Sequence, residues 1–155
     1  MTKIKSLFAS ILFATIPFTA SADDGRIVGT VDTAFKLLGP DHKIEVQAFP
    51  DPQVAGVTCF VSYSKKGGIT GALGLATDNS EHSIACRKTS KITVTASQLP
   101  PKDEVFKQSR SILFKKMRVV RMTDVATNTL IYVVYSDKLI DGSPKNSITA
   151  VSIDY

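Results

Sequence analysis

Apolar and polar residues alternate with a period of two through much of the chain after residue 25, and this pattern constrains the fold more than any other feature. The clearest run is VTCFVSY at 57–63, in which Val57, Cys59 and Val61 would share one face of a strand. The run KIEVQAF at 43–49 repeats the pattern and ends at Pro50. Side chains on one face of a helix recur about every 3.6 residues, so a period of two predicts β-strands instead.

Similar runs extend this prediction to the rest of the chain. Further strands are expected at 25–35, 83–87, 92–95, 111–122, 130–135 and 146–153. The turn-rich stretch 124–129 should join the two longest runs into a hairpin. Helical signals are few: 32–38 is an alternative short helix with Asp32 as its N-cap, and 71–76 would make one turn. We therefore predict an all-β fold, mainly an antiparallel sandwich or barrel, with at most one or two short helices.

The first 22 residues have the features of a secretory signal peptide. Lys3 and Lys5 form a positive start, an apolar stretch of 12 residues follows at 7–18, and the small residues of 20–22 precede Asp23. An apolar stretch of this length is too short to span a bilayer, which takes about 20 residues. The sequence thus predicts a signal peptide at 1–22 and a single mature domain at 23–155 without a transmembrane segment.

The mature domain would be only mildly basic. Loss of Lys3 and Lys5 lowers the formal charge from +5 to +3, so the pI of about 9.3 overstates the basicity of the working protein. This small excess does not indicate binding to nucleic acid, and we expect no nucleic-acid partner. Residues 23–155 are enough to bury one independent core.

The only two cysteines, Cys59 and Cys86, form an even pair in a chain that is expected to be exported. That combination favours a disulfide. A catalytic redox pair is usually C-x-x-C, whereas these residues are 27 positions apart in apolar surroundings. We predict a structural disulfide that closes the Gly-rich segment 67–80 into a tethered loop.

No sequence motif identifies a catalytic residue. The chain has two histidines, and no serine lies in a G-x-S-x-G pattern. Asp41, His42 and Ser143 would form part of a hydrolase triad only if the fold brought them together, because triads are defined by geometry. Ordinary turn chemistry at Pro40 and Asp41, with His42 at the surface, is the favoured interpretation. An envelope hydrolase that uses His42 is kept as the alternative function.

Neither a metal site nor a cofactor site is predicted. Two histidines exclude a three-histidine metal site. The polar stretch at 78–82 lacks the glycine and glutamate that an EF-hand loop requires at its sixth and twelfth positions. The Gly-rich stretch at 66–74 lacks the terminal G-K-[ST] of a phosphate loop.

A basic run between residues 107 and 121 is the one charge feature that stands out. It contains no acidic residue, and its basic members are Lys107, Arg110, Lys115, Lys116, Arg118 and Arg121. Such a run usually forms a solvated strand face that protects a sheet edge from pairing. The alternative is a surface for an anionic component of the cell envelope.

Ten blocks distributed over nearly the whole mature chain carry a family resemblance. They are VDTAFK (31–36), GPDHKI (39–44), AFPDP (48–52), GVTCFVS (56–62), GGITGALGLATDNS (67–80), SIAC (83–86), VFK (105–107), VVR (119–121), YSDK (135–138) and GSPKNSI (142–148). In this order they resemble the CreA family, also called catabolite regulation protein A. The resemblance implies a small exported protein of Gram-negative bacteria that resides in the periplasm, and it supplies no catalytic residue. An exported chain is separated from cytoplasmic DNA, so we do not interpret it as a transcription factor.

The sequence therefore predicts a periplasmic protein that binds an envelope partner, which is not identified and for which an anionic molecule is one candidate. The candidate binding segments are the polar turns GPDHK at 39–43 and GSPKN at 142–146, although both also suit ordinary turns. Their candidate binding residues are Asp41, His42, Lys43, Ser143, Lys145 and Asn146.

Overall fold

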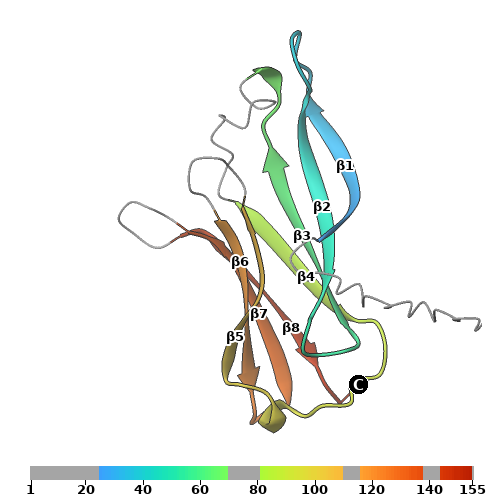
Figure 1. The fold of residues 1–155 in the computed structure, drawn as a ribbon, viewed down its shortest axis with the longest axis vertical. Helices are drawn as coiled ribbons and strands as arrows, with labels where there is room; N and C mark the ends of the chain where they lie inside the picture. Colours follow the sequence, from blue (N-terminus) through green and yellow to red (C-terminus); the bar gives the residue numbers. More distant parts are fainter. Residues whose placement is uncertain (1–24, 70–80, 110–115, 138–143, 155) are drawn as a thin grey trace, which may run out of the picture.

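The protein is an antiparallel β-sandwich of two four-stranded sheets (Figure 1). The computed structural model describes residues 25–69, 81–109, 116–137 and 144–154. The first sheet has the order β1 (Arg26–Ala34), β2 (His42–Pro50), β3 (Val57–Lys65), β4 (His82–Lys88). The second has the order β5 (Lys102–Ser109), β6 (Lys116–Asp124), β7 (Thr129–Ser136), β8 (Asn146–Ser152). A short 3-10 turn, η1 (Ala96–Gln98), lies in the connection between the sheets, and the prediction of an all-β fold is confirmed.

The two sheets enclose an apolar core. Strand β4 lies against β7 and β8 of the other sheet. Along the opposite seam, Phe49 of β2 stacks on Phe106 of β5 with ring centroids 4.2 Å apart. The alternation of 57–63 is the burial pattern of β3, whose residues Val57, Cys59 and Val61 are buried while their neighbours are half-buried. Each such side chain stabilises the fold by about 1.5–3 kcal/mol when it is fully buried.

Most of the predicted strands are confirmed. The runs at 43–49, 57–63, 83–87 and 146–153 coincide with β2, β3, β4 and β8, and 25–35 coincides with β1. The hairpin expected around 124–129 is formed by β6 and β7. Its turn is closed by Asp124, which accepts hydrogen bonds from the Ala126 amide and the Thr127 hydroxyl, and by Asn128 with a φ of 47°.

Three local predictions were wrong. The alternative helix at 32–38 does not form, because β1 continues to Ala34 and Gly39 adopts a φ of 85° in a hairpin connection. The run at 92–95 is irregular, and Ile92 reaches the core without belonging to a strand. Strand β5 was missed, because a bulge after Glu104 breaks its alternation and buries two successive residues. The turn expected at 71–76 and the start of the run at 111–122 lie outside the described residues.

The predicted disulfide is confirmed. Cys59 of β3 and Cys86 of β4 are direct cross-strand partners, and their sulfur atoms are bonded. Both side chains lie in the core. A disulfide of this kind is consistent with an oxidising compartment.

A buried ion pair ties the second sheet to the connection between β2 and β3. The side chain of Arg121 in β6 is fully buried. Its Nη1 donates to both carboxylate oxygens of Asp51 at 2.8 Å. Its Nη2 donates to Gln53, and the Tyr132 hydroxyl of β7 donates to Asp51 at 2.8 Å. Burial and the adjacent Asp51 raise the pKa of Tyr132, which keeps its hydroxyl a donor. The interpretation of the basic run as a solvated face was therefore wrong for Arg121.

The odd-numbered strands of both sheets run toward one end of the sandwich. Strands β1, β3, β5 and β7 end there and β2, β4, β6 and β8 begin there (Figure 1). We call this the loop end. The β6–β7 turn at 125–128 lies at the opposite end of the molecule. GPDHK and the described residues 144–146 of GSPKN lie at the loop end, which is therefore the candidate functional region of the molecule.

Candidate functional site at the loop end

Hydrogen bonds connect the GPDHK segment, at the end of the β1–β2 hairpin, to the residues that directly follow β3. The imidazole of His42 accepts a hydrogen bond at Nδ1 from the Gly67 amide at 2.9 Å. The Gly68 amide donates to the Pro40 carbonyl at 2.7 Å, and Asp41 accepts the Lys36 amide at 2.7 Å. These contacts show that Asp41 and His42 position the backbone of the hairpin.

The close approach of these two segments explains why glycine occupies position 67. A Cβ there would lie 1.9 Å from the Pro40 carbonyl oxygen and 2.4 Å from that of Asp41. Such distances are far below van der Waals contact, so any larger residue would force the segments apart. At Gly29, by contrast, a Cβ would meet nothing within 4 Å.

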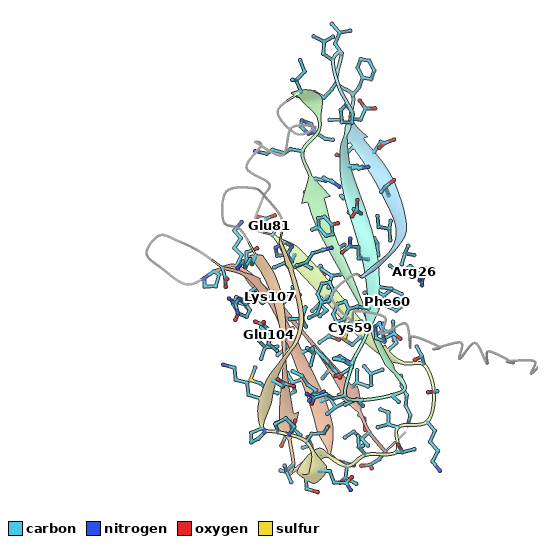
Figure 2. The ribbon with its side chains drawn as sticks, in the orientation of Figure 1. Arg26, Cys59, Phe60, Glu81, Glu104 and Lys107 are labelled. Atoms are coloured by element: carbon cyan, nitrogen blue, oxygen red, sulfur yellow. A yellow bond between two sulfur atoms is a disulfide. The ribbon has the colours of Figure 1, made fainter. Side chains whose placement is uncertain are left out.

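Large apolar side chains project from this braced hairpin into solvent. Phe35, Leu37 and Leu38 are 80%, 87% and 67% exposed, and Ile69, next to Gly68, is 57% exposed. We call these four residues the apolar tip. Figure 2 shows side chains at the end of the β1–β2 hairpin pointing away from the rest of the molecule. Sequence reasoning missed this feature, because residues 35–38 were interpreted as the end of a strand at 25–35 or as part of a short helix at 32–38.

The GSPKN segment lies beside the start of β4. Lys145 forms an ion pair with Glu81, and the hydrogen bond from Lys145 lowers the pKa of the Glu81 carboxyl group. Asn146 begins β8, and its side-chain amide donates to the Pro144 carbonyl. Ser143 lies outside the described residues. Among the described residues, no hydrogen bond or ion pair joins this turn to GPDHK.

A hollow of about 320 Å³ lies on the first sheet, near the loop end. It is lined by Ile44, Ser62, Tyr63, Ser64, Glu81, His82 and Ser83. Ile44 is opposite Ser64 and Ser62 is opposite Ser83 in the sheet, so these side chains share the outer face of β2, β3 and β4. Ile44 directly follows the GPDHK segment, and Glu81 is the partner of Lys145. The hollow therefore adjoins both segments, but no described residue of either segment lines it.

The inner face of the first sheet becomes polar as it approaches the loop end. Glu45 of β2 is buried and accepts hydrogen bonds from the Tyr63 hydroxyl and the Gln47 amide. Lys65 lies 3.5 Å from the other carboxylate oxygen of Glu45. The ring of His82 meets Tyr63 edge-on at 6.4 Å between centroids.

His82 also supplies the one histidine–serine hydrogen bond in the described part of the chain. Its Nε2 lies 2.6 Å from the Ser136 hydroxyl, which is only 4% exposed. His42, the histidine singled out from the sequence, instead uses Nδ1 to accept a backbone amide. The sequence could not indicate the His82–Ser136 contact, because the two residues are 54 positions apart and belong to different sheets.

The described members of the basic run are engaged in different ways. Arg118 pairs with Glu104 and Asp137, and Lys107 pairs with Glu104 on the same strand at 3.6 Å (Figure 2). Lys116 is exposed at the start of β6. Arg110 and Lys115 lie outside the described residues. In the part of the sequence that the structure covers, the run is not a continuous free basic face.

Comparisons with known proteins agree with the residue blocks. The family model described as CreA protein matches residues 28–155. The chain is 45% identical to Protein CreA of Escherichia coli K12 over 97% of this chain and 96% of that protein. Protein CreA of Escherichia coli O157:H7 is similar to the same extent. No solved structure gives a significant match. The described residues include no helix long and apolar enough to cross a bilayer. A family model that covers most of the chain and these full-length relatives show that the chain belongs to the CreA family.

Proposed function

We propose that this member of the CreA family is exported to the periplasm and binds an envelope partner through its loop end. The observation that carries the proposal is the apolar tip, whose three hairpin residues are each at least two-thirds exposed. Large exposed apolar residues gathered in one place mark interaction sites in proteins that otherwise bury such groups. The tip is held in place by the bonds of Asp41 and His42, so the polar turn and the apolar residues form one binding element.

Export is supported by the order of features in residues 1–22 and by the disulfide. We expect the protein recovered from the periplasmic fraction to begin at Asp23. N-terminal sequencing of that material measures the cleavage site directly. Recovery of only full-length protein from the cytoplasm would contradict export.

Affinity capture from periplasmic and membrane extracts tests binding at the loop end. The bait protein is compared with Leu37→Asp at the tip and with Val125→Asp at the opposite end, where Val125 is 61% exposed. We expect Leu37→Asp to lose the captured partner and Val125→Asp to retain it. We expect His42→Ala to keep the fold and to weaken capture, because the hairpin loses its hydrogen bond to Gly67. Equal capture by all four proteins would argue against a loop-end site.

A hydrolase is the second candidate function, and the His82–Ser136 contact at 2.6 Å is the observation that favours it. Binding without catalysis predicts that a fluorophosphonate probe does not label the folded protein. Labelling that disappears in Ser136→Ala, while the variant stays folded, would support the hydrolase instead.

A further inference from the structure

We propose that the apolar tip inserts into the surface of a bilayer that contains anionic phospholipid, an inference that rests on the proposed function and specifies the chemistry of its partner. The tip is the end of a hairpin that extends beyond the rest of the sandwich (Figure 1). A flat surface that faces this end of the molecule meets the hairpin before the body of the protein.

The apolar side chains of the tip are not used to hold the fold together. The hairpin end is fixed by polar contacts: the Lys36 amide to Asp41, the Gly68 amide to Pro40 and the Gly67 amide to His42. Phe35, Leu37 and Leu38 remain outside these bonds and largely exposed. A rigid backbone that presents unused apolar groups can transfer them into lipid without first losing internal contacts.

The shape of the tip favours lipid over a folded protein partner. A stable interface between proteins buries roughly 800 Å² on each side and needs matching surfaces around its centre. Three side chains at the end of one hairpin, with Ile69 of the neighbouring segment, offer only a small surface. Lipid adapts to a convex group, and burial of each apolar side chain contributes without shape matching.

The lysines near the tip outweigh the exposed acids by a small margin, which favours contact with an anionic surface. Lys36 lies between two tip residues, and Lys43 is the second residue of β2. Neither lysine forms an ion pair with a residue that the structure describes. Of the nearby acids, Glu45 is buried and accepts the Tyr63 hydroxyl. Asp41 is half-buried, accepts the Lys36 amide and offsets part of the positive charge of the tip. Asp32, across from Lys43 in the sheet, offsets part of this positive charge. Lysines near an anionic surface strengthen binding by about fivefold each.

A tryptophan reporter tests the insertion, because the chain contains no tryptophan. Phe35→Trp places the reporter in the tip, and Val125→Trp places it on the opposite end. The variants, purified from the periplasmic fraction, are mixed with vesicles of phosphatidylglycerol and phosphatidylethanolamine. We expect emission from Phe35→Trp to shift to shorter wavelength and to become protected from a water-soluble quencher, while emission from Val125→Trp stays unchanged.

Vesicle sedimentation gives the matching affinities. We expect the double variant Leu37→Asp/Leu38→Asp to bind about tenfold or more weakly than the parent protein, since two apolar groups no longer enter lipid. Lys36→Gln should lose about fivefold on anionic vesicles and little on neutral phosphatidylcholine vesicles.

Three outcomes would overturn the inference. Absence of a vesicle-dependent shift, together with tip-dependent capture of a protein, would leave the proposed function standing and replace lipid by a protein partner. A shift that depends on protein concentration without vesicles would identify the tip as a contact between two copies of the chain. Equal vesicle binding by the parent and by Leu37→Asp/Leu38→Asp would place any membrane contact elsewhere.

Discussion

Replacement of Arg121 by methionine is expected to lower the free energy of unfolding by about 3–5 kcal/mol, because it leaves a carboxylate buried without its partner. Arg121 and Asp51 are both fully buried, and Asp51 also accepts the Tyr132 hydroxyl and the backbone amides of Gln53 and Val54. Loss of the guanidinium therefore affects the connection after β2 and two strands of the second sheet together. Urea unfolding followed by circular dichroism measures the change.

Arg118 provides a matched control on the same strand. It also forms two ion pairs, with Glu104 and Asp137, but its side chain is 27% exposed. Arg118→Met should therefore cost no more than about 1 kcal/mol, as exposed pairs usually do. The double variant Asp51→Ala/Arg121→Met should lose less than the sum of its single variants, because the two residues act as one pair. Similar losses for Arg118→Met and Arg121→Met would contradict the structural role of the buried pair.

Replacement of Cys59 by serine is expected to lower the free energy of unfolding by about 2–5 kcal/mol, as loss of a native disulfide in a small secreted domain usually does. The bond to Cys86 joins neighbouring strands of the first sheet on its core side and restricts the unfolded chain between positions 59 and 86. Reductant should lower the midpoint of urea unfolding of the parent protein, while that of Cys59→Ser should not respond. Cys86→Ser is the matched variant and should behave in the same way.

Thiol alkylation supplies the independent check on the disulfide. Protein from the periplasmic fraction, unfolded without reductant, should contain no reactive thiol. Two alkylated cysteines in that material would contradict the bond and would return Cys59 and Cys86 to the class of reactive thiols.

The alternation of apolar residues was enough to predict most of the strands, because strands such as β3 and β7 bury one face in the core. Strand β1, by contrast, is exposed along its whole length. The alternation located β2, β3 and β8 closely and predicted that Cys59 points inward. It failed for β5, where charged residues and a bulge hide the pattern. It also failed at residues 35–38, where apolar residues are exposed instead of buried.

The candidate site was only partly predictable, because its contacts connect distant parts of the chain. The polar turn with Asp41 and His42 stood out by composition, but its bonds to Gly67 and Gly68 depend on how the hairpin packs against the end of β3. Arg121 was placed with the other basic residues, since nothing in the sequence links it to Asp51, 70 positions away. Only the three-dimensional structure shows which polar groups are buried and which are hydrogen-bonded to distant segments.

Photocrosslinking in living cells tests most directly whether the loop end is the binding surface. A photoreactive phenylalanine analogue is introduced at Leu37 in one strain and at Val125 in another, and both proteins are illuminated at their natural level of expression. Binding through the loop end predicts crosslinked envelope material, lipid or protein, for the Leu37 position and none for the Val125 position. Absence of adducts at Leu37, or equal adducts at both positions, would contradict a binding function of the loop end.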